Sequence, residues 1–229
     1  MTLEEFQQHN NVQFNNKNLL EQAFIHRSFI NENPRSGLEH NERLEFLGDA
    51  VLELIVTEYL YSEYPHHNEG DLTAYRSALV NAVTLGGVAD SLSFNDLLRL
   101  SKGEAKDVSR ARSSILADAY EAFVGALYLD QGYDTVKSFI MKTLLGKTDE
   151  IIRKGLYRDA KSFVQEKSQE LYGVTPSYRV LHEEGPDHDK IFRVGIYFND
   201  DLIAEGEGKS KQEAETGAAR SALEKKGWE

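Results

Sequence analysis

Two groups of acidic residues stand out because each lies inside a segment that is otherwise largely apolar. In the first group, Glu42, Glu45 and Asp49 follow one another at intervals of three and four residues. On a helix this spacing places the three carboxylates on one face, while Leu44 and Val51 belong to a second, apolar face. An acidic stripe is more often a solvated surface than a binding site, so this group alone does not establish a function.

The second group is more informative because its surroundings are more apolar. Asp118 and Glu121 are the only acids in residues 114–129, and they lie one helical turn apart among core-type side chains. Almost any orientation of a helix there would bury them at least partly. Buried carboxylates are costly unless they are paired or bound to a cation. No lysine or arginine lies between residues 113 and 137 to neutralise them from the same helix.

A divalent cation is one way to neutralise these carboxylates, and hard oxygen ligands suit Mg²⁺. Carboxylate pairs from two helices can converge on such an ion in the core of a helical bundle. A site of this kind activates water and stabilises the leaving oxygen in phosphodiester hydrolysis. The alternative is an ion pair of Asp118 or Glu121 with Arg43 or Arg76, and the residues leave both interpretations open.

Other kinds of active site are excluded by what the chain lacks. It has no cysteine, so thiol catalysis, disulfides and cysteine-bound zinc are ruled out together. No glycine-rich loop ends in Gly-Lys-Ser or Gly-Lys-Thr, and the segment His40–Leu44 does not have the order of a zinc-binding His-Glu-x-x-His motif.

The composition describes an ordinary globular protein with an excess of acids. Of 229 residues, 40% are hydrophobic and 28% are charged, and the formal net charge is −12. This charge argues against a nucleic-acid partner unless the bases are clustered and metal ions offset the carboxylates. There is no apolar run of membrane-spanning length and no secretory start. We therefore expect a cytoplasmic protein without a membrane partner or a small-molecule cofactor.

Residues 1–153 carry helical periodicity with few turn signals and predict an all-α domain. One amphipathic segment opens at residues 19–24. The longer predicted helices cover residues 43–61, 71–85, 114–129 and 135–145. The first of these is expected to end before Tyr64-Pro65, and the second at Gly86-Gly87.

Residues 159–229 have a different pattern, which predicts a small α+β domain of order α-β-β-β-α. A helix is expected at residues 159–172, closed by Gly173. The expected strands are residues 177–181, 191–198 and 202–206, and the expected closing helix is residues 211–225. Residues 199–201 predict a tight hairpin turn, and residues 154–158 the linker between the domains.

The motifs resemble those of bacterial ribonuclease III over essentially the whole chain. His40–Leu52, HNERLEFLGDAVL, is similar to the family signature, and Ser114–Ala122 to its second catalytic block. Shorter matches in the same order are Glu69–Leu72, Arg76–Asn81 and Gly103-Glu104. The C-terminal part resembles the double-stranded-RNA-binding domain that follows the nuclease domain in bacterial members.

The resemblance implies a role for each matching acid. The metal-binding carboxylates would be Glu45, Asp49, Asp118 and Glu121. Asp49 and Glu121 would be catalytic, with Glu121 tied most directly to hydrolysis. Glu42, Glu69 and Glu104 would be supporting acids, Glu69 around the cleavage valley of the dimer and Glu104 near the scissile strand.

The resemblance also implies the reaction and the assembly. Family members use Mg²⁺, with Mn²⁺ as a possible substitute, to cut double-stranded RNA into products with 5′-phosphates, 3′-hydroxyls and short 3′ overhangs. They act as homodimers in which each subunit cuts one strand. Dimerisation would pack Phe46-Leu47-Gly48 across the two-fold axis, although Phe46 and Leu47 could equally belong to the core of their own chain. Ribosomal RNA precursors are the substrate that the family suggests, with other structured RNAs and messenger RNA as further targets.

One segment departs from the family pattern. Relatives often carry Ser-Gly-Gly followed by basic residues, whereas residues 106–113 of this chain keep the length but lack the glycine pair. Arg110 and Arg112 preserve a basic character there that suits phosphate. The departure affects the expected positioning of RNA and leaves the four carboxylates untouched.

The C-terminal domain offers the three contact points that reading a duplex by its shape requires. They lie on the first helix, on the loop 185–188 and at the start of the last helix, where free N–H groups also favour phosphate. The candidate RNA-binding residues are Lys161, Ser162, Gln165, Glu166, His188, Lys209 and Lys211. Relatives often have a third basic residue at the position of Gln212. From Leu156 onward the chain has 15 acidic and 11 basic residues, so binding is expected to be weak and strongly salt-sensitive.

Two further hypotheses compete with an active nuclease. A catalytically silent double-stranded-RNA-binding protein on the same fold would be favoured by the loss of a carboxylate, yet Glu45, Asp49, Asp118 and Glu121 are all present. An acidic helical scaffold would leave the acids of the apolar segment 114–129 unexplained.

Overall fold

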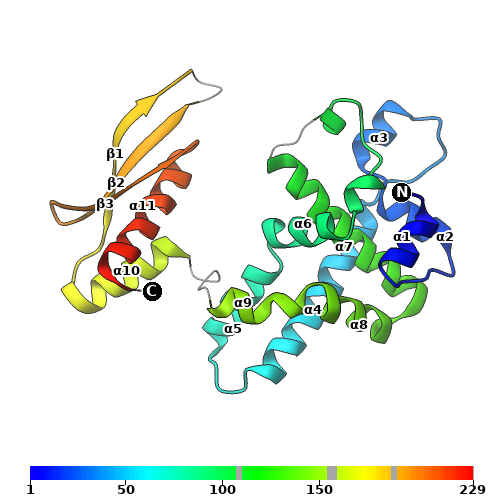
Figure 1. The fold of residues 1–229 in the computed structure, drawn as a ribbon, viewed down its shortest axis with the longest axis horizontal. Coiled ribbons are helices and arrows are strands. Elements are labelled where there is room, and N and C mark those ends of the chain that lie inside the picture. The colour runs from blue at the N-terminus through cyan, green and yellow to red at the C-terminus, as the bar shows by residue number, and fades with distance from the viewer. Residues whose placement is uncertain (107–109, 154–158, 187–189, 229) are drawn as a thin grey trace. The chain divides into compact units, whose positions relative to one another are not determined.

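The computed structural model describes residues 1–106, 110–153, 159–186 and 190–228, in two compact units, Met1–Tyr157 and Arg158–Glu229. The predicted linker, residues 154–158, lies outside the described residues. Figure 1 shows the helical first unit and the second unit with its three strands.

The described part of the first unit is helical, as the periodicity predicts. Its α-helices are α1 (Leu3–His9), α2 (Lys17–Ala23), α3 (Arg27–Glu32), α4 (Glu42–Glu63), α5 (Glu69–Leu79), α6 (Ala82–Ser91), α7 (Arg110–Gln131), α8 (Tyr133–Thr143) and α9 (Thr148–Arg153). Short 3-10 turns cover Phe94–Asp96, Glu104–Lys106 and Leu145–Lys147. The described helices include none that is both long and apolar enough to cross a membrane.

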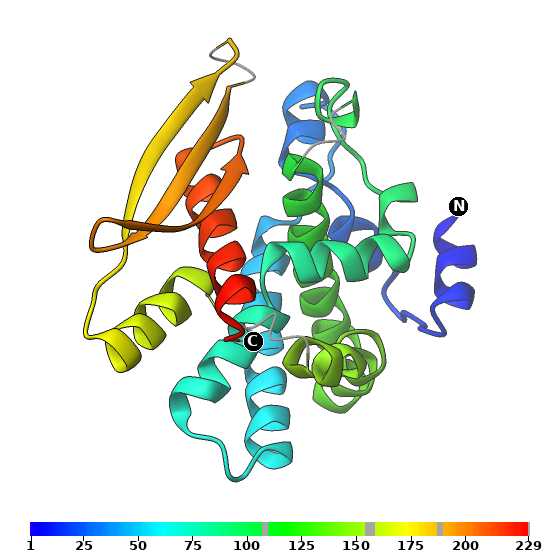
Figure 2. The same ribbon diagram turned by 60° about the vertical axis from the view of Figure 1, so that its left-hand side comes forward.

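Helix α7 runs through the middle of this unit, with α4 and α6 packed along it (Figure 2). Its residues from Ala122 to Leu127 are buried. Phe123 of α7 makes edge-on ring contacts with Phe6 and Phe94, at centroid distances of 5.7 and 5.3 Å. The core therefore surrounds the helix on which the sequence places two of the acids.

The predicted helix over residues 71–85 is wrong, because the chain forms two helices there. The side chain of Asn81 accepts a hydrogen bond from the N–H of Thr84 and so caps the start of α6. Its amide nitrogen donates to the carbonyls of Ser77 and Ala78 at the end of α5. Gly86 does not end a helix but lies inside α6.

Gly86 is needed where α6 approaches α7. A Cβ atom at this position would lie 2.5 Å from the carbonyl oxygen of Ser113, well inside contact distance. The glycine therefore permits close packing of the two helices instead of ending one of them.

The second unit has the predicted α-β-β-β-α order. It comprises α10 (Ala160–Tyr172), β1 (Ser177–Glu184), β2 (Ile191–Phe198), β3 (Asp201–Gly208) and α11 (Lys211–Lys226). The strands form an antiparallel sheet in the order β1-β2-β3, and Asn199 at the tip of the β2–β3 hairpin has a φ of 55°. Strand β1 continues to Glu184, beyond the predicted end at residue 181.

Both helices of this unit cover the same face of the sheet, as Figure 1 shows. Ile196 and Phe198 of β2 pack with Val164 of α10 and Ala218 of α11. Small side chains on α11 bring it close to β3: a Cβ atom on Gly206 would lie 2.0 Å from the backbone nitrogen of Ala218. The opposite face of the sheet carries Arg193, which pairs with Glu207 at 2.7 Å.

Candidate active site and RNA-binding face

Helices α4 and α7 cross where each carries a glycine. A Cβ atom on Gly48 would lie 1.7 Å from the carbonyl oxygen of Glu121. One on Gly125 would lie 2.2 Å from the carbonyl oxygen of Leu44. Both distances are far below van der Waals contact, so the two backbones can approach this closely only through glycine. The crossing brings the acids of α4 against the acids of α7.

Three of the four acids predicted to bind metal are partly buried at this crossing. Glu45 on α4 is half-buried, as are Asp118 and Glu121 on α7, whereas Asp49 on α4 is exposed. The sequence argument required Asp118 and Glu121 to be partly buried, and the structure places them so.

Burial raises the pKa of the three partly buried acids, and negative neighbours add to the rise for Glu45 and Glu121. Burial, followed by the charges of Asp49, Asp118 and Glu45, raises the pKa of Glu121 to about 8. Burial, followed by the charges of Asp118, Glu42 and Asp49, raises the pKa of Glu45 to about 7. Burial also raises the pKa of Asp118. Glu45 and Glu121 thus lie within electrostatic range of the other acids, while the imidazole of His26 lowers the pKa of Asp118 against the effect of burial.

The alternative of an ion pair with arginine is not realised among the described residues. Neither Asp118 nor Glu121 forms an ion pair there, and Arg76 donates to the hydroxyl of Thr57 at 3.0 Å. Within the same residues, no three histidine, aspartate or glutamate side chains converge closely enough to hold a metal ion. The donors that face one another at the crossing are carboxylates, the oxygen ligands that Mg²⁺ prefers.

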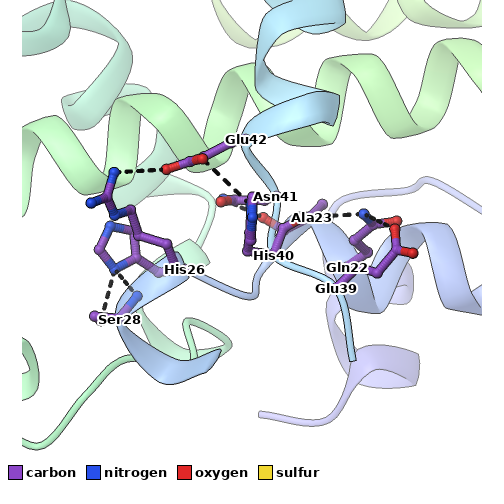
Figure 3. Close-up of polar contacts among 9 residues, drawn as sticks. Gln22, Ala23, His26, Ser28, Glu39, His40, Asn41 and Glu42 are labelled. Carbon is purple, nitrogen blue, oxygen red and sulfur yellow. Dashed lines mark hydrogen bonds and ion pairs between the residues drawn. The ribbon is translucent and has the colours of Figure 1, made fainter. Parts of the chain in front are cut away.

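Glu42, the first acid of α4, lies at the edge of this cluster and is itself paired. Its carboxylate accepts a hydrogen bond from Arg27 at 3.1 Å and lies 3.7 Å from the Nδ1 atom of His40 (Figure 3). Its negative charge contributes to the raised pKa of Glu45. Glu42 therefore adds negative charge near Glu45, and its side chain is held by basic neighbours.

The start of α4 is anchored by the residue before it. Asn41 is buried, and its amide nitrogen donates to the carbonyl of Ala23 at 3.2 Å. Its backbone N–H donates to the carbonyl of Ile25 at 2.9 Å. Gln22 donates to the carbonyl of His40 at 3.1 Å, as Figure 3 shows. These bonds tie the first turn of α4 to the segment between α2 and α3.

The two remaining supporting acids lie apart from the crossing. Glu104 is half-buried in the 3-10 turn 104–106, and its charge acts on the imidazole of His26. Glu69 is exposed at the start of α5 and is not among the charges that raise the pKa of Glu45 or Glu121.

The first helix of the second unit presents a polar face. Asp159 caps α10 by accepting from the N–H of Ser162 at 3.0 Å. Ser162, Gln165 and Glu166 are exposed and line an open hollow. Lys161 is less free, because its ammonium pairs with Glu215 at 2.5 Å and lies over the ring of Tyr178 at 4.9 Å.

The start of the last helix carries the other candidate bases. Lys209 and Lys211 are exposed, and Ser210 caps α11 by accepting from the N–H of Glu213. Lys211 pairs with Glu183 of β1 at 3.3 Å. His188 lies outside the described residues.

Comparison with known proteins decides the family. Residues 16–148, more than half of the chain, match the Ribonuclease-III-like family, and residues 160–226 match the double-stranded RNA binding motif. The chain belongs to the ribonuclease III family.

Similar members of the ribonuclease III family share nearly the whole length of the chain. It is 47% identical over 221 residues to Ribonuclease 3 of Geobacillus kaustophilus HTA426, covering 96% of this chain and 89% of that protein. It is 45% identical over 214 residues to Ribonuclease 3 of Streptococcus pneumoniae P1031, covering 93% of this chain and 92% of that protein.

A solved structure supports the first unit as a ribonuclease III nuclease domain. The nuclease domain of ribonuclease III from Campylobacter jejuni covers 62% of this chain and 95% of its own, at a TM-score of 0.56 and 39% identity. That structure is described as showing flexibility in the region involved in dimer formation.

The segment that departs from the ribonuclease III pattern is only partly described. Residues 107–109 lie outside the described residues. Arg112 is half-buried, and among the described residues its Nη1 atom has no hydrogen-bond partner. The role expected for this arginine toward phosphate therefore stays a prediction.

Sequence reasoning missed two residues that shape the ribonuclease III site. Glu53 of α4 adds to the negative field on Glu121. His26 lies within the fields of Glu104 and Asp118, and burial lowers its pKa against them. Glu53 could have been found, since it continues the spacing of Asp49 by one helical turn. No periodicity marks His26, because it is brought to the site by contacts between distant segments.

Proposed function

We propose that the chain is an endoribonuclease that hydrolyses phosphodiester bonds in double-stranded RNA. The observation that carries the proposal is the acid pair of the apolar helix α7, Asp118 and Glu121, held against Glu45 and Asp49 of α4 by a glycine crossing. The family and the double-stranded RNA binding motif supply the substrate class.

We infer that Glu45, Asp49, Asp118 and Glu121 hold Mg²⁺, with Mn²⁺ as a substitute. The residues fit such an ion in three respects: their donors are carboxylate oxygens, no ion pair among the described residues neutralises Asp118 or Glu121, and burial together with neighbouring acids raises the pKa of Glu45 and Glu121. When bound, the ion supplies Lewis-acid stabilisation of charge on the phosphate oxygens and lowers the pKa of water.

The side chains have separate tasks in this proposal. Asp49 and Glu121 are the catalytic carboxylates, and Glu121, the more buried of the two, is tied most directly to hydrolysis. Glu42, Glu69 and Glu104 support the reaction from the periphery. The products expected are 5′-phosphate and 3′-hydroxyl ends with short 3′ overhangs, as in the family.

RNA binding is assigned to the helical face of the second unit. Ser162, Gln165 and Glu166 on α10 have exposed polar ends suited to 2′-hydroxyls. Lys209 and Lys211 lie at the capped start of α11, where the helix dipole also favours phosphate. Lys161 and His188 complete the proposed set.

A homodimer is part of the proposal, supported by the outward face of α4. Phe46, Leu54 and Tyr61 of this helix are 82%, 58% and 75% exposed, at intervals of about two helical turns. Gly48 does not join them, because its backbone is used in the crossing with α7. Leu47 is half-buried and packs on the core of its own chain. A role in processing ribosomal RNA precursors and other structured RNAs, in the cytoplasm, rests on the family alone.

The test compares the wild type with Glu121→Gln on a long RNA duplex, with and without Mg²⁺. We expect Mg²⁺-dependent cutting by the wild type and a loss of at least about a hundredfold in the variant, as for removal of a catalytic group. Glu63→Gln, which removes an exposed acid from the far end of α4, is the matched control and should cut normally.

The outcome separates the proposed nuclease from a silent RNA-binding protein. Binding of the duplex by the wild type without cutting in Mg²⁺ or Mn²⁺ would establish the silent alternative. Equal cutting by the wild type and Glu121→Gln would remove the carboxylates from the mechanism.

A further inference from the structure

A relay of hydrogen bonds joins the start of α3 to the turn that carries Glu104. The hydroxyl of Ser28 lies 2.8 Å from Nδ1 of His26 and accepts from the backbone N–H of Ser101 at 3.0 Å. The hydroxyl of Ser101 in turn accepts from the N–H of Glu104 at 3.2 Å. Ser28 and Ser101 are 73 positions apart in the chain, so the relay is a tertiary contact.

The direction of each bond is fixed by what the groups can donate. The backbone N–H of Ser101 can only donate, so the Ser28 oxygen accepts from it. The Ser28 hydroxyl donates its own hydrogen to Nδ1 of His26, because this nitrogen is already an acceptor. Nδ1 also accepts from the backbone N–H of Ser28 at 3.3 Å. With Nδ1 as the acceptor, the neutral imidazole carries its hydrogen on Nε2.

The relay begins where a short backbone pairing ends. The N–H of His26 donates to the carbonyl of Arg99 at 3.1 Å, and the N–H of Arg99 donates to that of Phe24 at 2.8 Å. Beyond this pairing, the bonds that join residues 101–104 to α3 come from the hydroxyl of Ser28 and from the carboxylate of Glu32, which accepts from the N–H of Lys102 at 3.1 Å.

The relay also lies beside the acid cluster. The charges of Glu104 and Asp118 both act on the imidazole of His26, which places the ring within electrostatic range of the turn and of α7. Ser101 is the capping residue of the turn, because its carbonyl also accepts from the N–H of Ala105 at 2.9 Å. Loss of the Ser28 bond would therefore leave this turn joined to α3 by the bond from Lys102 to Glu32 and would loosen the capping residue of Glu104.

We propose that Ser28, oriented by His26, is a positioning residue for the nuclease reaction, which holds the turn that carries Glu104 in place through Ser101. The inference rests on the proposed function, since it takes Glu104 to assist hydrolysis. Ser28 acts through Glu104 and does not touch the RNA.

The first test measures kcat and KM of the full chain on duplex RNA with Mg²⁺. Ser28→Ala should lower kcat about tenfold with little change in KM, as for the loss of one hydrogen bond felt only in the reaction. Ser28→Thr keeps the hydroxyl and should restore most of kcat. The matched control is Ser62→Ala, whose hydroxyl donates only to Glu58 of its own helix.

A pair of substitutions separates the two nitrogens of His26. His26→Asn places an acceptor near the position of Nδ1 and should keep most of kcat. His26→Gln reaches the position of Nε2 instead and should behave like Ser28→Ala. If His26→Gln keeps more of kcat than His26→Asn, the imidazole acts through Nε2 and the proposed relay is overturned.

The second test asks whether Ser28 acts through Glu104. Adding Ser28→Ala to Glu104→Ala should cause no further loss of kcat, because the group being positioned is already gone. If the losses of kcat in the two single variants add in full in the double variant, Ser28 has a general structural role and the inference is overturned. If Ser28→Ala melts below the assay temperature, Ser101→Ala replaces it, since it removes only the last link.

Failure of the inference can be told from failure of the proposed function. A wild type that does not cut would overturn both. Wild-type cutting together with an unchanged kcat in Ser28→Ala would overturn the inference alone.

Discussion

At the scale of single residues, Glu121 is an acid whose environment opposes its ionisation. Its pKa is raised from an ordinary value of 4.5 to about 8, first by burial and then by neighbouring carboxylates. The folded state therefore holds this proton over a range in which the unfolded chain has lost it. By linkage, stability without divalent cations should fall as pH rises from about 4.5 through about 8.

Glu121→Gln lacks this ionisation and should show a smaller fall over the same range. Urea unfolding midpoints of both proteins in EDTA, at acid, neutral and alkaline pH, measure the effect. The fall in stability with rising pH that remains in the variant comes from Glu45 and Asp118, whose pKa values are also raised. Parallel curves for the two proteins would contradict the assignment of the effect to Glu121. Added Mg²⁺ should stabilise the wild type more at alkaline than at acid pH, because the ion competes with protons.

Two lysines of the proposed RNA-binding face are paired with acids of their own unit. Lys161 pairs with Glu215 and Lys211 with Glu183, so RNA must compete with these carboxylates for the ammonium groups. Glu215→Gln and Glu183→Gln should each raise affinity for duplex RNA about threefold, the range of an exposed ion pair.

The matched control for these substitutions is Glu207→Gln. Glu207 pairs with Arg193 on the face of the sheet away from the helices, and the change removes the same charge. Binding titrations at two salt concentrations measure the effect, which should shrink at the higher one. An equal rise in affinity for the control would show that net charge alone sets binding.

The sequence predicted the partial burial of two acids but did not predict the residues that surround them. Asp118 and Glu121 could be predicted because carboxylates inside an apolar helix are locally anomalous. The contact between Ser28 and Ser101 could not, because it depends on the start of α3 meeting a distant segment in the folded chain. The exposure of Phe46 was also undecided by periodicity, since an apolar residue suits a core and an interface equally well.

At the scale of elements, the long helices could be predicted and their interruptions could not. Predicted segments 43–61 and 114–129 lie within α4 and α7, because their apolar spacing extends over many turns. The break between α5 and α6 depends on one capping residue, Asn81, whose local bonds outweigh a continuous pattern. At Gly86 the sequence pattern predicts the end of a helix, whereas in the structure this glycine allows α6 to pack closely against Ser113.

The glycine crossing of α4 and α7 gives a prediction at this scale. Gly48→Ala would place a methyl group 1.7 Å from the Glu121 carbonyl oxygen, so the helices must separate. We expect a loss of about 2 kcal/mol or more in the free energy of unfolding, together with a loss of kcat. Gly87→Ala is the control, because Gly87 lies in α6 with nothing within 4 Å of the added atom. That change should stabilise by up to about 1 kcal/mol, the helix preference of alanine over glycine.

Urea unfolding and steady-state cleavage of the two variants check the prediction. A Gly48→Ala protein as stable and active as the wild type would contradict the close crossing. Equal destabilisation by both changes would point to backbone flexibility instead of contact between the helices.

At the scale of the whole molecule, a chain with a net charge of −12 acts on a polyanion by dividing the task between two units. The first unit gathers carboxylates, whose repulsion is relieved by cations. The second carries exposed lysines at the start of α11 and polar side chains along α10. The proposed homodimer adds a further level, because one cluster per chain would account for one cut, and cutting both strands of a duplex would require two clusters.

The last prediction concerns this assembly. Phe46 is 82% exposed on α4, and an aromatic side chain so placed is typical of the centre of an interface. Phe46→Ser should weaken self-association of the full chain by at least about tenfold, measured by sedimentation equilibrium. Leu129→Ser is the matched control, because Leu129 is 54% exposed near the end of α7 in the same unit.

Cleavage should follow association: on dilution, the specific activity of Phe46→Ser should fall at higher protein concentrations than that of the wild type. A wild type that stays monomeric while cutting both strands, or equal weakening by Leu129→Ser, would exclude the outward face of α4 as the dimer contact.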